Sequence, residues 1–168
     1  MAAEVMSASD RTAASYKRLA ASADILTAAS DEFSKSISVL DGALKLLNLG
    51  ISAWEGISGT DDDGNGNYWS EDVGYAKVGG TWGIALRVRS GRHKGEEETH
   101  EEWLFNDGPR AMRIGAIDKI PDLLERLVKA ADKTTKKVQE KTSQALELAA
   151  AILKTAEEIE LQRKQRHH

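Results

Sequence analysis

An acidic stretch near the middle of the chain has the residue types and the spacing of a calcium-binding loop. It runs Asp61-Asp62-Asp63-Gly64-Asn65-Gly66-Asn67, so side chains that carry oxygen stand at alternate positions and Gly66 permits a sharp turn. Counted from the first aspartate, the residues that match the calcium-loop pattern are Asp61, Asp63, Asn65 and Asp72. Closely spaced carboxylate and amide oxygens suit a hard cation, so these residues are the candidate ligands for Ca²⁺.

The surroundings of this stretch differ from those of a calcium loop. A strand is expected to enter it in place of a helix, Trp69 occupies the ninth position, and Asp72 stands at the twelfth, where glutamate is usual. Asp, Asn and Gly are also the residues that ordinary turns favour. A solvated acidic turn is therefore the favoured interpretation, and a calcium site stays open as the alternative.

Two sets of basic residues are candidates for contacting a partner. Arg87 and Arg89 lie at the end of an expected strand and could bind an acidic or phosphate group, although a run of glutamates after residue 95 would neutralise them. Lys129, Lys133 and Lys137 recur every four residues on an expected helix. They form either a solvated helix face or a basic docking stripe for an acidic partner.

No arrangement of residues in the sequence indicates catalysis. The chain has no cysteine, which excludes a thiolate nucleophile and a thiolate metal site. The internal histidines, His93 and His100, lie among charged residues with no second ligand or base at a defined spacing. No glycine-rich phosphate loop and no Gly-x-Ser-x-Gly turn is present. We therefore expect a protein that is not an enzyme and holds no cofactor.

Charge and hydropathy limit the other function classes. The net charge of −4 gives no general attraction to nucleic acid or to an anionic membrane. The longest apolar run, Leu148 to Leu153, is far shorter than the roughly 20 residues of a membrane span. Residues 1–10 lack the basic start and apolar run of a signal peptide. We expect a cytoplasmic protein with no membrane span and no nucleic-acid partner.

The middle of the chain has the composition of a small β-sheet. Residues 51–108 contain all four tryptophans and carry a net charge of −7. Gly79-Gly80 between two apolar runs is typical of a two-residue hairpin. Four antiparallel strands are expected at 51–58, 73–78, 81–90 and 99–105, followed by a short helix at 109–119.

The outer segments have the pattern of long helices with a coiled-coil seam. In both, apolar or small residues recur at spacings of three and four. The last segment has two successive steps of four, from Thr134 through Val138 to Thr142, where the heptad pattern stutters. The seam of the first segment comprises Thr12, Tyr16, Leu19, Ala23, Leu26, Ser30, Phe33, Ile37, Leu40, Leu44 and Leu47. That of the last comprises Leu124, Leu127, Ala131, Thr134, Val138, Thr142, Ala145, Ala149, Ile152, Ala156 and Ile159.

A helix with a narrow apolar stripe needs a partner, and the two outer segments are predicted to pack on each other. Placing Leu44 opposite Leu127 brings Leu26 opposite Ala145, so that large residues mostly face small ones. The predicted fold class is α+β. A long antiparallel helical hairpin, or coiled-coil stalk, would carry an inserted four-stranded antiparallel sheet and a short helix. The segments are residues 1–50, 51–120 and 121–168.

The expected hairpin would still leave apolar residues on its outer surface. These are Ile25, Val39, Leu46, Leu146, Leu153 and Leu161. Contiguous apolar patches of this kind are unfavourable in water, and a homodimer through the stalk could cover them as a four-helix arrangement.

Residues 74–127 contain stretches that resemble uncharacterised bacterial proteins. The resemblance is carried by residues 74–87, by residues 102–110 and by residues 120–124. It implies a bacterial source and no particular activity.

Together these features predict a non-catalytic protein–protein interaction or scaffolding module with an unidentified protein partner. The alternative is an ion- or small-ligand-binding domain that uses the acidic loop at residues 61–72.

Overall fold

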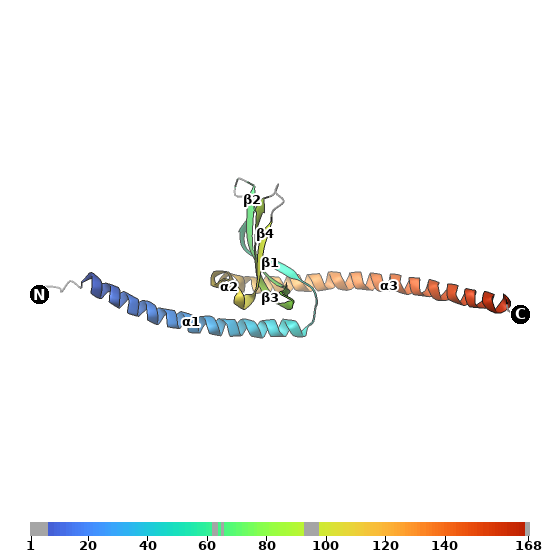
Figure 1. Cartoon of the computed structure of the whole chain (residues 1–168), viewed down its shortest axis with the longest axis horizontal. Coiled ribbons are helices and arrows are strands. Elements are labelled where there is room, and N and C mark those ends of the chain that lie inside the picture. Colours follow the sequence, from blue (N-terminus) through green and yellow to red (C-terminus); the bar gives the residue numbers. More distant parts are fainter. Residues whose placement is uncertain (1–6, 62–63, 65, 93–97, 167–168) are drawn as a thin grey trace.

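The protein is an α+β structure in which a small sheet stands on two long helices (Figure 1). This computed structural model describes residues 7–61, 64, 66–92 and 98–166. The long helices are α1 (Ala8–Leu46) and α3 (Ile120–Arg166). The Ser7 hydroxyl caps the start of α1 by accepting a hydrogen bond from the backbone N–H of Asp10 at 3.1 Å.

The sheet is the expected antiparallel meander of four strands, in the order β1-β2-β3-β4. Its strands are β1 (Ala53–Thr60), β2 (Asn67–Val78), β3 (Thr81–Arg92) and β4 (Thr99–Leu104). Strand β2 begins well before residue 73, where the apolar pattern alone placed its start. Pairing with β3 continues out to Asn67 opposite Arg92, so backbone hydrogen bonding overrides the polar composition of this segment.

The hairpin between β2 and β3 sets the register of the sheet. Gly79 and Gly80 have φ values of 56° and 88°, the left-handed conformation that a two-residue primed turn requires. This turn pairs Val78 with Thr81. One face of the two central strands is then apolar, and it carries Val73, Tyr75, Ile84 and Leu86.

Short helical segments after β4 complete the cover of this face. They are η1 (Phe105–Asp107), α2 (Arg110–Ala116) and η2 (Ile117–Lys119), and they lead directly into α3. The resulting core draws on the sheet and on all the helices. It consists of Ile37, Val73, Tyr75, Ile84, Leu86, Phe105, Met112, Ala116, Ile120, Leu123 and Leu127.

Helix α1 is fixed to the sheet by polar contacts as well as by buried Ile37. The Asp41 carboxylate accepts a 2.7 Å hydrogen bond from the backbone N–H of Ile84, where β3 extends past the end of β4. A Cβ at Gly83 would lie 2.9 Å from the same carboxylate, so glycine allows this close approach. The carboxylate therefore satisfies a backbone donor that no strand pairs.

A second group of hydrogen bonds holds α1 against η1 and α2. The Asn106 amide donates to the backbone oxygen of Ser34 at 3.2 Å and to the Ser38 hydroxyl at 3.1 Å. The Arg113 guanidinium donates to the Ser34 hydroxyl at 3.1 Å. Together with Asp41, these contacts fix the direction in which α1 leaves the sheet.

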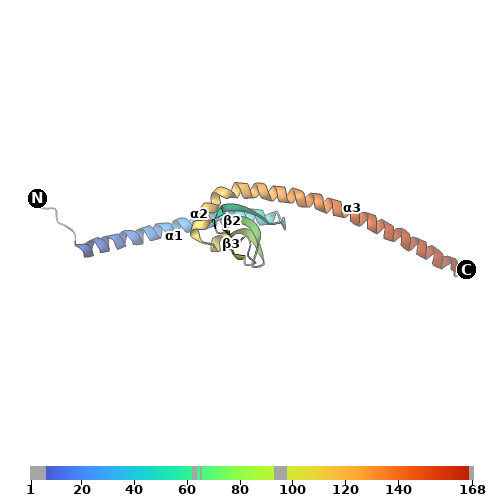
Figure 2. The same ribbon diagram turned by 90° about the horizontal axis from the view of Figure 1, so that it is seen from above.

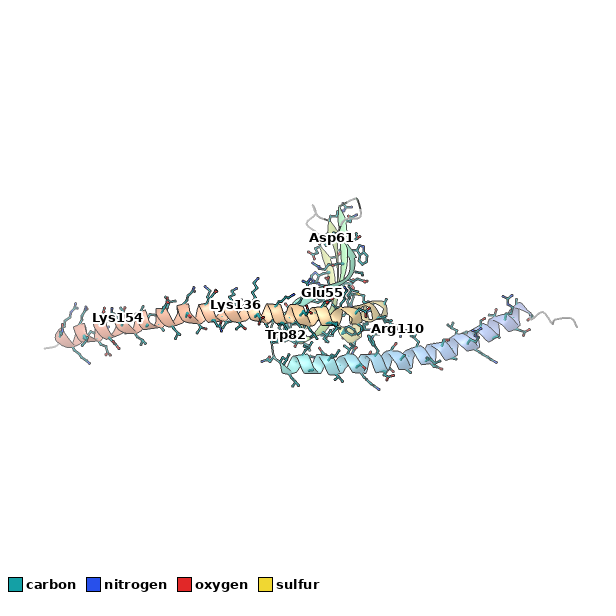
Figure 3. All side chains as sticks on the ribbon, turned by 180° about the vertical axis from the view of Figure 1, so that it is seen from behind. Glu55, Asp61, Trp82, Arg110, Lys136 and Lys154 are labelled. Atoms are coloured by element: carbon teal, nitrogen blue, oxygen red, sulfur yellow. The ribbon has the colours of Figure 1, made fainter. Side chains whose placement is uncertain are left out.

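Helix α3 is fixed only at its start. Leu123 and Leu127 are buried in the core, and Arg126 forms an ion pair with Glu55 of β1. Figure 3 shows Glu55 beside this first part of α3, while Lys136 and Lys154 lie farther out on the same helix.

The structure does not confirm the expected antiparallel helical hairpin. In the part of the chain that is described, α1 and α3 run in the same direction and extend to opposite sides of the sheet (Figures 1 and 2). We call the part of each long helix that extends beyond the sheet its arm. Leu26 belongs to α1 and Ala145 to α3, so the predicted pairing of these two residues within one chain is not confirmed. The heptad pattern predicts that another helix packs on the seam, but it does not predict the direction of either helix. The contacts of Asp41, Ser34 and Leu123 fix the directions of α1 and α3.

No helix among the described residues combines the length and the apolar character that crossing a membrane requires.

The contact between Asp41 and Ile84 gives a testable prediction. Replacing Asp41 with alanine leaves the backbone N–H of Ile84 without its acceptor, and we expect the free energy of unfolding to fall by about 1–3 kcal/mol. Urea unfolding at one fixed protein concentration measures the change. The matched control is Asp31→Ala on the same helix, where the side chain is exposed and the expected change is below about 0.5 kcal/mol. Equal changes in the two variants would contradict the proposed role of Asp41.

Candidate functional site

Beyond the sheet, both long helices expose their apolar seams. We define the α1 seam as Thr12, Tyr16, Leu19, Ala23, Leu26 and Ser30, and the α3 seam as Val138, Thr142, Ala145, Ala149, Ile152, Ala156 and Ile159. Leu19 in the α1 seam is 66% exposed, and Ile152 in the α3 seam is 69% exposed. Large apolar side chains at regular helical spacing are normally covered, so both seams are candidate interaction surfaces.

Apolar residues outside the seams are exposed too. Those expected on the outer surface of the hairpin all have relative exposures above one half, and they are Ile25, Val39, Leu46, Leu146, Leu153 and Leu161. The arms therefore expose more apolar surface than a single narrow stripe.

The outer part of α3 has a shallow, open apolar groove between side chains of the same helix. This α3 groove has a volume of about 390 Å³ and is lined by Leu148, Ala151, Ile152, Thr155, Ala156 and Ile159. Because its lining is mostly apolar and lies at helical spacing, side chains of another helix could pack against it.

The predicted lysine stripe lies on the exposed surface of α3. Lys129, Lys133 and Lys137 are exposed and form no ion pair with another described residue. The lysine stripe is therefore available to a partner.

A cluster of charged residues occupies the sheet face opposite the core. Asp72 is 5% exposed, and one of its carboxylate oxygens accepts hydrogen bonds from Nε and Nη2 of Arg87 and from Nε of Arg89, each at 3.1 Å. The Arg87 guanidinium also lies 4.0 Å from the ring centroid of Trp54. Gly74 lies under that ring and has no room for a side chain. A buried carboxylate is thus balanced by two guanidinium groups, one of them covered by an indole.

This cluster borders a polar cavity of about 410 Å³. Glycines and small hydroxyl residues of β1 and β2 leave the space, which is lined by Gly56, Ile57, Ser58, Gly59, Asp61, Trp69, Ser70, Asp72 and Arg89. The hydrogen-bonding groups around it could bind a small polar molecule.

The structure places the candidate calcium ligands in different environments. Asp61 lies at the end of the sheet that is far from the helices (Figure 3), and Asp63 and Asn65 lie outside the described residues. Asp72 lies within strand β2 and is paired with Arg87 and Arg89. No group of three or more potential metal ligands occurs among the described residues. The two guanidinium groups beside Asp72 disfavour a cation there.

The predicted partner-binding residues Arg87 and Arg89 differ in their availability. Arg87 is held by Asp72 and Trp54, with an 18% exposed side chain, whereas the side chain of Arg89 is 37% exposed and borders the cavity. Sequence reasoning did not find the pairing of Asp72 with Arg87. The signal was present, because a tight turn at Gly79-Gly80 places these two residues directly opposite each other.

Comparisons of the chain with protein-family models, with curated proteins and with solved structures found no match. The resemblance of residues 74–127 to uncharacterised bacterial proteins stays a prediction.

The charged cluster gives a prediction about stability. Replacing Arg87 with leucine removes two of the three guanidinium hydrogen bonds to buried Asp72, so we expect a loss of about 2–4 kcal/mol in the free energy of unfolding. Arg92→Leu is the matched control, because Arg92 is exposed and its hydrogen bond among the described residues is to the Asn67 side chain. Urea unfolding of both variants measures the difference. Comparable losses would show that the cluster contributes no more than a surface contact.

The acidic loop gives a second prediction. Millimolar calcium is expected to leave the melting temperature and the tryptophan fluorescence unchanged, since the guanidinium groups beside Asp72 oppose a bound cation. Trp69 lines the same cavity as Asp61 and would report binding there. A saturable fluorescence change that disappears in Asp61→Ala would contradict this expectation.

Proposed function

We propose that the protein is a non-catalytic protein–protein interaction or scaffolding module whose two helical arms bind other helices. The observation that carries the proposal is the pair of exposed apolar seams on arms that extend to opposite sides of one small sheet. A helix with one apolar stripe gains most of its stability from packing, so an arm of this kind is favoured when another helix covers it.

The distribution of residues along the chain supports this function. Helices α1 and α3 comprise 39 and 47 of the 168 residues, and most of that length lies beyond the sheet. These residues build long surfaces, whereas the buried charges on the sheet are held in ion pairs. The simplest partner is a second copy of the chain, and we propose a homodimer formed through the arms.

A second candidate function is binding of an ion or small ligand at the sheet. The cavity lined by Asp61, Ser70, Asp72 and Arg89 favours it, because charged and hydroxyl groups converge there. A calcium response that Asp61→Ala removes would make this candidate the first choice.

Self-association through the arms is testable by sedimentation equilibrium. We expect a dimer at tens of micromolar protein. Leu19→Glu places a carboxylate in the α1 seam and should weaken association by about a hundredfold, or roughly 3 kcal/mol.

The matched control is Lys17→Glu, which introduces the same side chain on the α1 surface outside the seam and should leave association nearly unchanged. A wild-type protein that stays monomeric at these concentrations would contradict self-association. Equal weakening in both variants would contradict the role of the seam.

A further inference from the structure

We propose that two copies of the chain exchange arms, so that the α1 seam of each copy packs antiparallel on the α3 seam of the other. This inference rests on the proposed self-association and specifies its geometry. These are the contacts between the α1 and α3 seams that the sequence predicted within one chain, but here a second copy supplies the partner helix.

The directions of the helices lead to this arrangement. In both views α1 and α3 run the same way along the long axis of the molecule, with their arms at opposite ends (Figures 1 and 2). A two-fold axis perpendicular to that long axis reverses the second copy. Its α3 arm then lies beside the first copy's α1 arm and points the opposite way. The same operation forms a matching pair at the other end, so the dimer is closed and symmetric.

The contacts at the sheet prevent one chain from making these pairs by itself. Asp41 and Ser34 hold α1, and Leu123, Leu127 and the Arg126–Glu55 ion pair hold α3. Closing the two arms on each other would require one helix to reverse its direction and lose its set of contacts. A second copy covers both seams while all of these contacts remain.

The seams match in size in one antiparallel register. Leu26 meets Ala145, and Leu19 meets Ile152 within the α3 groove. Tyr16 meets Ala156 within the same groove, and Tyr16 is 72% exposed in the single chain. The groove thus lies where the largest side chains of the α1 seam would enter it.

The residues that flank the seams favour pairing of α1 with α3 over pairing of like helices. The α1 seam is flanked by small side chains, namely Ala13, Ser15, Ala20, Ser22, Thr27 and Ala29. The α3 seam is flanked by Leu146, Leu148 and Leu153, each more than 60% exposed. Two α1 arms would leave gaps between small residues, and two α3 arms would crowd leucines together. The mixed pair places large flanks against small ones at close packing.

Charges at both ends of this register support the antiparallel direction. Arg11 of one copy lies near Glu158 and Glu160 of the other, and Asp31 lies near Lys137 and Lys141. A parallel pair would instead place Arg11 in the lysine-rich part of α3. Lys17 and Arg18 gain no acidic neighbour in the antiparallel register. Exposed pairs contribute only about 0–1 kcal/mol each, so they select the direction more than they add affinity.

Disulfide crosslinking of the full chain tests the arrangement, because the wild type has no cysteine. Leu26→Cys protein is mixed with Ala145→Cys protein, left to exchange subunits, and oxidised at the concentration where sedimentation shows a dimer. We expect a covalent heterodimer, since paired seam residues in contact can satisfy the roughly 6 Å Cα separation of a disulfide. Neither single variant alone should crosslink.

The matched control mixes Leu26→Cys protein with Ala156→Cys protein, which lies about 16 Å farther along the α3 seam. Its crosslink yield should be at least about tenfold lower. The double variant Leu26→Cys, Ala145→Cys, oxidised at the same concentration, should give covalent dimers that persist when the protein is diluted.

The outcomes separate this inference from the proposed function. A monomer in sedimentation would overturn arm exchange together with self-association, and would leave binding of the arms to a different protein as the proposed function. A dimer without the crosslink between positions 26 and 145 would overturn arm exchange and leave self-association standing. A fast crosslink within single chains of the double variant would overturn arm exchange in favour of the closed hairpin.

Discussion

A helix that carries a single apolar stripe is stable only where another surface covers the stripe, and this constraint governs most of the molecule. The sheet covers part of the apolar stripe of each long helix, since Ile37 of α1 and Leu123 and Leu127 of α3 are buried against the sheet. Farther along, Leu19 and Ile152 are exposed to a similar degree on opposite arms. The apolar face of the sheet and the helix segments packed on it are therefore covered within one chain, whereas the seams on the two arms are not.

The sheet shows how much of the fold local sequence signals can predict. Gly79-Gly80 predicts the central hairpin, and the alternation of residues on β3 predicts its apolar face. The same hairpin also determines that Asp72 lies opposite Arg87, so the charged cluster could have been derived from the sequence. The calcium-loop pattern gave a different prediction, because it assigned Asp72 to a loop as a candidate metal ligand. Pairing with β3 extends β2 through this position, and a polar segment can join a strand when its neighbour supplies the hydrogen bonds.

The arms show what such signals do not contain. Their heptad spacing predicted two long helices, and the structure has them. The spacing does not say which chain supplies the covering helix, because the same contacts can form within a molecule or between molecules. The residues that fix the direction of α1 are polar, and their spacing in the sequence follows no distinctive pattern. Asp41, which accepts the N–H of Ile84, stands between Leu40 and Gly42, and nothing in its spacing distinguishes it from the other acidic residues of α1.

These polar contacts make an open chain with two arms more favourable than a closed hairpin. Reversing α1 would remove the hydrogen bonds of Asp41, Asn106 and Arg113, at about 0.5–1.5 kcal/mol each. It would also expose Ile37, a buried side chain whose exposure costs about 1.5–3 kcal/mol. Covering the seams within one chain must first offset these losses. Covering the seams with a second copy must instead offset the entropy lost on association, and the free-energy cost of that loss is smaller at a higher protein concentration. In the proposed dimer, a second copy covers both stripes while the contacts around the sheet remain in place.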